Sequence, residues 1–272
     1  MKNLLLTALT IALSGLFFLN CFMFPDSHEE LTGQSKLEKF KLGTTNPDSF
    51  AVVELFTSEG CSSCPPADEL MAKLQQENKD KNIYFMAYHV DYWDRLGWKD
   101  QFSSKDFTIR QQQYQDWLKL FVMYTPQFII NGSAEFAGYN ETALTHKIAE
   151  ALKTNQTETL QITAATSKDS IAIDFKINTL QKNSSLFIAV VQKHGTTKVE
   201  RGENSGNILH HVQIVRQLKS FPLPEKEGKV NLALPSHFNT KDFELIGFIQ
   251  NTETGTISAA TQLFLVETAG SN

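Results

Sequence analysis

Two cysteines with two residues between them constrain this chain more than any other feature. Cys61 and Cys64 follow the apolar run 51–57, which reads as a buried strand, and precede residues 65–77, whose apolar side chains recur at helical spacing. The N-terminus of a helix stabilises a thiolate through the macrodipole. A two-residue spacer lets the two sulfurs bond in a small, reducible ring. The pattern therefore predicts a redox-active disulfide.

Two prolines directly after the second cysteine locate the start of the helix. Proline is tolerated in the first turn of a helix but removes backbone hydrogen bonds deeper inside it. We therefore expect the regular helix to begin near Pro65, with Pro66 in its first turn and both cysteines in the entry turn. We expect Cys61 to be the more exposed, attacking sulfur and Cys64 to resolve the mixed disulfide.

Metal binding is the main chemical alternative for the cysteine pair. Structural zinc needs four ligands, and the chain has three cysteines and no second Cys-x-x-Cys, so redox chemistry is favoured. Two thiolates joined by His89 would suit copper(I), which leaves a copper-binding or metallochaperone module as an alternative. A non-catalytic adaptor with a structural disulfide is the third reading. No resident metal or cofactor is expected beside the disulfide Cys61–Cys64.

The N-terminus has the outline of an export signal. Lys2 precedes an almost entirely apolar run over residues 4–19, which is short for a transmembrane helix. We assign residues 1–21 to a signal and residues 22–48 to a linker. Cys21 lies where bacterial lipoproteins carry their lipid, so lipidation there is weighed against simple cleavage nearby. The expected location is extracytoplasmic, in the periplasm or cell envelope, with a lipid at Cys21 as the possible membrane anchor.

Charge excludes one class of partner. The chain has 30 acidic and 25 basic side chains, a net charge of -5, and no long basic run. Binding to phosphate backbones needs clustered lysine and arginine. We therefore expect no nucleic acid, and a protein or a small thiol as the redox partner.

The pattern of strands and helices predicts two domains. Over residues 49–156 the expected order is β–α–β–α–β–β–α, which is that of thioredoxin. Over residues 157–268 short strand-like runs alternate with turns at even spacing, as in an all-β sandwich or barrel. The predicted fold class is an α/β thioredoxin-like domain followed by a smaller all-β sandwich-like domain.

Two loops carry polar and aromatic side chains. Residues 91–102 follow the second strand, at the carboxyl end of the sheet, where ligands bind. Packing of the loop by Trp93 and Trp98 is the plainer interpretation of its aromatic residues. The polar loop 200–211, in the second predicted domain, is expected either to bind a partner or to pack against the first domain.

Four motifs in order resemble an uncharacterised family of secreted bacterial proteins, catalogued as domain of unknown function 1223, with a thioredoxin-like fold. They lie within residues 53–67, 89–93, 124–127 and 201–204.

The resemblance implies that Cys61 and Cys64 are the dithiol and that Pro126 is a cis proline facing it. In thioredoxin-like proteins the residue before that proline, here Thr125, offers its backbone to an extended substrate. Such enzymes also use a buried carboxylate for proton transfer, a role that Glu54 matches approximately. Tyr92 and Trp93 belong to a recurring motif and are expected to contact substrate. The expected activity is thiol–disulfide oxidoreduction.

Overall fold

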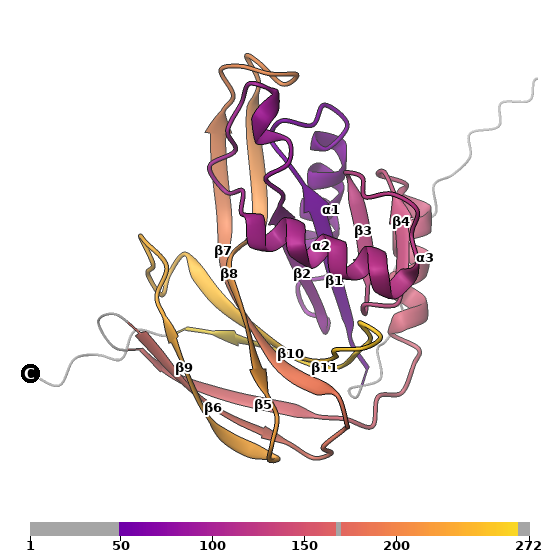
Figure 1. The fold of residues 1–272 in the computed structure, drawn as a ribbon, viewed down its shortest axis with the longest axis vertical. Coiled ribbons are helices and arrows are strands. Elements are labelled where there is room, and N and C mark those ends of the chain that lie inside the picture. Colours follow the sequence, from indigo (N-terminus) through magenta and orange to yellow (C-terminus); the bar gives the residue numbers. More distant parts are fainter. Residues whose placement is uncertain (1–48, 167–169, 266–272) are drawn as a thin grey trace, which may run out of the picture. The chain divides into compact units, whose positions relative to one another are not determined.

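A computed structural model describes residues 49–166 and 170–265 of the chain (Figure 1). The first part of the described chain alternates strands and helices, and its bounds are β1 Ala51–Thr57, α1 Pro65–Glu77, β2 Ile83–His89, η1 Asp94–Leu96, α2 Lys105–Leu118, β3 Gln127–Ile130, β4 Ala134–Ala137 and α3 Glu141–Ala151. The second part contains strands alone, with bounds β5 Leu160–Thr166, β6 Ser170–Ile177, β7 Ser184–Lys198, β8 Ile208–Pro222, β9 Glu227–Ala233, β10 Phe243–Asn251 and β11 Ile257–Phe264.

Eight of these strands pair into one mixed sheet, in the order β11-β10-β7-β8-β2-β1-β3-β4. β1 pairs in parallel with β2 and antiparallel with β3. β8 joins the edge of β2 in parallel, with Ala87 opposite Ile214. The remaining strands form a three-stranded sheet in the order β5-β6-β9. The long hairpin β7–β8 therefore belongs to the same sheet as the strand that precedes the cysteines.

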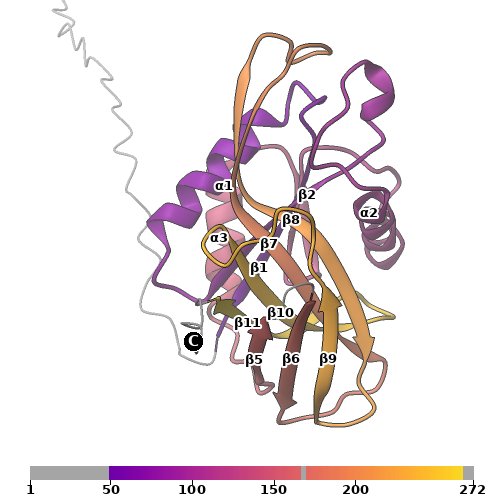
Figure 2. The ribbon, with the colours of Figure 1, turned by 90° about the vertical axis from the view of Figure 1, so that its left-hand side faces the viewer.

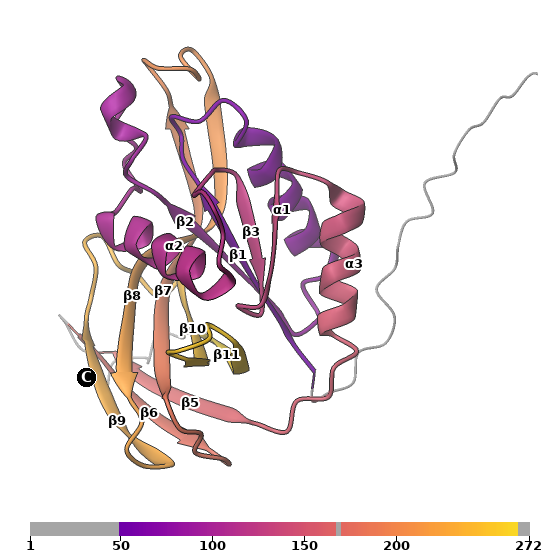
Figure 3. The same cartoon turned by 45° about the vertical axis from the view of Figure 1, so that its right-hand side comes forward.

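Buried side chains cover both faces of the sheet. β1 is fully buried, and its side chains alternate between the faces. Val53 and Leu55 pack with α1 and α3, whereas Val52 and Phe56 pack with α2 and with strand β10. Figure 3 shows α1 and α3 on one side of β1 and β3, with α2 on the other. The strand β1 is therefore central to two of the hydrophobic clusters.

A third hydrophobic cluster lies between the three-stranded sheet and strands β7 and β10. Ile171, Ile173 and Phe175 of β6 contribute to it, together with Ile188 of β7 and Leu245 of β10. Figure 2 shows β5, β6 and β9 side by side next to β10 and β11. Strands β7 and β10 thus pack against the three-stranded sheet and also continue the larger one.

The predicted fold class is wrong. The structure is mostly β, with one eight-stranded mixed sheet, one three-stranded sheet and three short α-helices in the described residues. It is not an α/β thioredoxin-like domain followed by a separate β-sandwich. The reason is strand pairing: β8 and β7 add to the free edge of β2, so strands assigned to a second sheet continue the first. The predicted boundary at residues 156/157 falls between α3 and β5.

Some predictions fall outside the described residues. The signal over residues 1–21, the linker over 22–48 and the lipidation site Cys21 all belong to that part of the chain. Across residues 49–166 and 170–265, no helix has the length and apolar character needed to cross a membrane.

Candidate functional site

The cysteine pair forms a disulfide at the start of α1. Cys61 and Cys64 are bonded, and their Cα atoms are 5.4 Å apart. Cys64 is the N-cap residue and two prolines open the helix, so the regular helix starts at Pro65 as expected. Both cysteines are fully buried, whereas Ser62 and Ser63 between them are exposed. The expectation that Cys61 is the more exposed sulfur is therefore wrong, and its attacking role stays a prediction.

The predicted proline lies beside the disulfide. The Thr125–Pro126 peptide bond is cis. The carbonyl oxygen of Thr125 is 3.9 Å from Sγ of Cys61. Trp93 Nε1 donates a hydrogen bond of 2.8 Å to Oγ1 of Thr125. Three segments that are far apart in the sequence thus meet at one place. They contain Cys61, Trp93 and the Thr125–Pro126 pair.

Tyr92 lies next to this group but is partly withdrawn from solvent. Its ring is 6.5 Å from the ring of Trp93, and it packs against the hydrophobic cluster on the α2 side of the sheet. Burial raises the pKa of Tyr92. Its expected contact with substrate stays a prediction.

Glu54 forms its contacts on the face of the sheet that is covered by α2 and not by α1. It forms a buried ion pair with Arg110 of α2, with 2.6 Å between Oε1 and Nη2, and it accepts a hydrogen bond from Tyr114. Burial would lower the pKa of Arg110, but attraction to Glu54 outweighs it and raises that pKa. The Glu54 contacts lie on the α2 side, whereas α1 packs on the opposite side. The structure therefore brings Glu54 to Arg110, and its predicted role in proton transfer gains no support from these contacts.

The sequence analysis missed a cluster of buried charged side chains. It lies between residues 58–64, here called the cysteine loop, helix α1 and strand β8. His211 Nε2 is 3.5 Å from Oε1 of Glu59, and its Nδ1 is 3.9 Å from Oδ1 of Asp68. These distances are long for hydrogen bonds, so the attraction is chiefly Coulombic. All three residues are buried. A cavity of about 70 Å³, lined by Pro65, Asp68 and His211, lies beside the cluster and has room for water.

This environment favours the imidazolium form of His211. Burial alone would lower the pKa of His211, but interactions with Asp68 and Glu59 outweigh burial and raise the pKa to about 10. The sequence contained two signals: adjacent histidines at 210 and 211 at the start of a strand, and the acidic residue Glu59 two positions before the first cysteine.

His89, the third ligand of the copper alternative, is committed elsewhere. Its Nδ1 lies 2.6 Å from Oδ2 of Asp100, and both side chains are fully buried. The same Oδ2 accepts a 2.9 Å hydrogen bond from the backbone N–H of Glu59. Burial opposes ionisation of Asp100, but attraction to His89 outweighs it and lowers the pKa of Asp100. Within the described ranges, no group of three histidine, cysteine, aspartate or glutamate residues is arranged to hold a metal ion.

The tip of the β7–β8 hairpin holds the cysteine loop. Asn204 is buried, and its Nδ2 donates to the carbonyl oxygens of Glu59 and Cys61, at 2.9 and 3.0 Å. Glu203 accepts a 3.0 Å hydrogen bond from the backbone N–H of Ser62. Hydrogen bonding to the side chain of Ser62, and then to its backbone, lowers the pKa of Glu203. The loop 200–211 therefore packs against the first half of the chain, which was one of its two expected roles.

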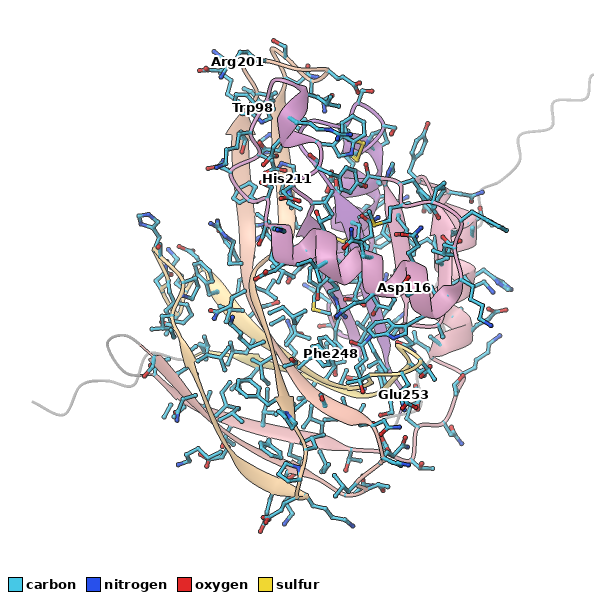
Figure 4. The ribbon with its side chains drawn as sticks, viewed as in Figure 1. Trp98, Asp116, Arg201, His211, Phe248 and Glu253 are labelled. Carbon is cyan, nitrogen blue, oxygen red and sulfur yellow. A yellow bond between two sulfur atoms is a disulfide. The ribbon has the colours of Figure 1, made fainter. Side chains whose placement is uncertain are left out.

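Trp98 joins this arrangement from the loop after β2. Its Nε1 donates a 2.7 Å hydrogen bond to Oε2 of Glu59. A Cβ placed on Gly202 would lie 3.3 Å from Cβ of Trp98, so the hairpin tip and the tryptophan are in close contact. Figure 4 shows Trp98 and Arg201 at the same end of the molecule, with His211 below them. Trp98 therefore contacts both the residues that lead into Cys61 and the hairpin tip.

Comparison with known proteins places this site in a family. A family model described as "Protein of unknown function (DUF1223)" matches residues 52–250, which include the cysteine pair, the cis proline and the hairpin tip. No curated protein matches the chain.

Among solved structures, the crystal structure of protein AGR_C_4864 from Agrobacterium tumefaciens is 26% identical, covers 84% of this chain and 100% of its own, and has a TM-score of 0.64. A domain of the outer membrane lipoprotein Omp28 from Porphyromonas gingivalis is 13% identical, covers 41% of this chain and 90% of its own, and has a TM-score of 0.26.

Proposed function

The chain belongs to the DUF1223 family of proteins of unknown function, and on that premise we propose that it is a thiol–disulfide oxidoreductase acting through Cys61 and Cys64. One observation carries the proposal: the disulfide lies at the N-terminus of α1 with Cys61 Sγ 3.9 Å from the carbonyl oxygen of Thr125. The macrodipole of α1 favours a thiolate at this position once the bond is broken.

The reaction exchanges one disulfide for another. A substrate thiolate attacks Sγ of Cys61, the Cys61–Cys64 bond breaks, and Cys64 leaves as a thiolate that takes up a proton. A second substrate thiolate then attacks the substrate sulfur of the mixed disulfide and releases Cys61 as a thiolate. The substrate loses two electrons as its disulfide forms, and the protein gains them as a dithiol. The reverse sequence reduces a substrate disulfide.

The substrate classes that fit are a protein with an extended segment or a small thiol. Backbone groups of Thr125 next to the disulfide would pair with an extended chain, and the Trp93 ring is held there by its hydrogen bond to Thr125. The exposed backbone between the cysteines carries only small side chains, Ser62 and Ser63.

A titration in glutathione buffers tests the proposal. Purified protein is equilibrated at graded ratios of reduced to oxidised glutathione, and the dithiol fraction is measured by alkylation and mass. We expect a reversible two-electron couple in which a tenfold change in the equilibrium constant corresponds to about 30 mV. The Cys64→Ser variant should instead trap a mixed disulfide with glutathione at Cys61. A pair that stays oxidised in every native buffer would refute the proposal.

A structural disulfide is the second candidate, and a specific observation favours it. Both cysteines are fully buried beneath the hairpin tip. If the disulfide is structural, its reduction by dithiothreitol will occur only at the rate of global unfolding. If it is catalytic, reduction will be faster than global unfolding, which is measured in parallel by far-ultraviolet circular dichroism.

We propose that this activity takes place outside the cytoplasm. The export signal predicted over residues 1–21 supports this location. The cysteine pair supports it too, because disulfides persist in oxidising compartments. Cell fractionation of the full chain tests it, and membrane-bound protein that is released by Cys21→Ser would indicate a lipid anchor. Recovery of the protein only in the cytoplasmic fraction would contradict the proposal.

A further inference from the structure

A cleft of about 630 Å³ lies away from the disulfide, between strands β7 and β8 and the loop 234–242 that leads into β10. Its volume is within the range of sites for small molecules. Figure 1 shows the β9–β10 loop beside β7. Lys193 of β7 donates a 2.8 Å hydrogen bond to the carbonyl oxygen of Lys241, so the two walls are tied together.

The lining of the cleft carries positive charge on an acidic protein. Lys193, Arg216 and Lys241 supply three cations, and the one carboxylate of the lining is Asp242. That carboxylate already accepts a 3.1 Å hydrogen bond from Asn239. The net charge of the whole chain is -5, so the cleft is a local exception. A concave site in which one sign of charge predominates raises the local concentration of counter-ions.

Arg216 is the most constrained of these cations. Its guanidinium lies 5.2 Å from the centroid of the Phe102 ring, and its Nη1 donates a 2.8 Å hydrogen bond to Gln192. In the described part of the chain, no carboxylate lies within 4.0 Å of this guanidinium. Burial lowers the pKa of Arg216, and attraction to Asp100 offsets this only in part. A bound anion would compensate the half-buried charge.

Two buried aromatic rings form the apolar part of the lining. Phe102 is 6% and Phe243 is 3% exposed. A Cβ on Gly195 of β7 would lie 2.7 Å from the tip of the Phe102 ring, so the absence of a side chain at 195 makes room for this ring. The cleft therefore combines a fixed guanidinium with an apolar surface.

We propose that this cleft binds a small organic anion. The carboxylate of the ligand would accept paired hydrogen bonds from the planar fork of Arg216, which matches carboxylate geometry. Its planar, apolar body would lie against Phe102 and Phe243. Lys193 and Lys241 would attract the anion to the cleft.

Isothermal titration with benzoate tests the proposal, because benzoate joins one carboxylate to one planar ring. The oxidised full-length protein is titrated at low ionic strength, and inorganic phosphate is the comparison probe. We expect benzoate to bind at one site, Arg216→Gln to weaken it at least tenfold, and Arg216→Lys to weaken it too, since a lysine keeps the charge but loses the fork.

Lys219→Gln is the matched control. Lys219 lies in the same strand, is exposed, and is not part of the lining, so the variant removes one charge without altering the cleft. Benzoate binding should be unchanged in Lys219→Gln. If Arg216→Gln fails to fold by circular dichroism, Arg216→Lys and Lys241→Gln carry the test. Absence of benzoate binding, equal binding by Arg216→Lys and the unchanged protein, or binding of phosphate without benzoate would each overturn the proposal.

Discussion

Two carboxylates, from segments far from His211 in the sequence, lie beside its imidazole ring. Glu59 comes from the loop after β1 and Asp68 from the first turn of α1, and both approach the imidazole in a buried setting. A buried charge is costly to leave without a partner, so each member of the cluster depends on the others. The cluster also links α1 to β8, which makes it a connection between the two halves of the chain.

The pKa of His211 predicts how stability changes with pH. Its folded pKa of about 10 lies above the unfolded value of 6.5, so its contribution is fully present below pH 6.5 and is lost as the pH rises through about 10. We expect His211→Gln to lower the free energy of unfolding by a few kcal/mol at pH 6, and by less at pH 10. Urea unfolding at both pH values measures this difference.

The exposed His146 is the control for this measurement. Its side chain is 63% exposed, so His146→Gln should change the free energy of unfolding little at either pH. A stability difference between the parent protein and His211→Gln that stays constant from pH 6 to pH 10 would contradict the assignment of a buried imidazolium.

At the scale of elements, we expect the β7–β8 hairpin to limit access to the disulfide. Its tip contributes Asn204 and Glu203, and together these side chains take up backbone groups at three positions of the cysteine loop. The cysteine loop has few N–H groups left for a thiolate, because Pro65 and Pro66 have none and the N–H of Cys64 donates to Cys61. Displacement of the hairpin tip would therefore both expose the sulfurs and release the N–H of Ser62.

We expect Asn204→Ala to accelerate reduction of the disulfide in the native protein. The variant loses two hydrogen bonds of about 1 kcal/mol each, which corresponds to roughly a thirtyfold increase in the open population. The rate of thiol release with dithiothreitol measures the effect. Asn207→Ala, an exposed position in the same tip, should leave the rate unchanged. Equal rates for Asn204→Ala and the parent would show that the tip does not limit access.

At the scale of the whole molecule, the halves of the chain share one hydrophobic cluster. Phe56 and Tyr88 from the first half pack in the same cluster as Val191, Val215 and Phe248 from the second. Removing the second half would uncover this surface and the edge of β2. Described residues on both sides of the predicted boundary also fall within one compact unit.

We therefore expect one cooperative unfolding transition for the protein. Circular dichroism and tryptophan fluorescence should give coincident urea curves, because the shared cluster couples both halves. A fragment of residues 49–156 should show poor dispersion in a two-dimensional amide NMR spectrum. Two separate transitions, or a well-dispersed spectrum of the fragment, would show that the halves fold independently.

Residues close together in the sequence determined several local features of this protein. Pro65 and Pro66 set the start of α1 because proline lacks an N–H, and the spacing of Cys61 and Cys64 allowed a disulfide. The strand β1 also appears over residues 51–57, where the apolar run predicted it. The resemblance implied that Glu54 is a buried carboxylate, but its partner Arg110, 56 residues away, could not be identified from the sequence.

Tertiary structure alone decided which strands pair and which loops meet. Alternation of apolar side chains marks the faces of a strand and not its neighbours, so nothing local indicated that Ile214 of β8 would lie opposite Ala87 of β2. From that pairing follow the single large sheet, the burial of His211 beside Asp68, and the contact of Asn204 with the cysteine loop 143 residues away. Each of these depends on long-range packing of hydrophobic faces, whose free energy is gained only when the whole chain has folded.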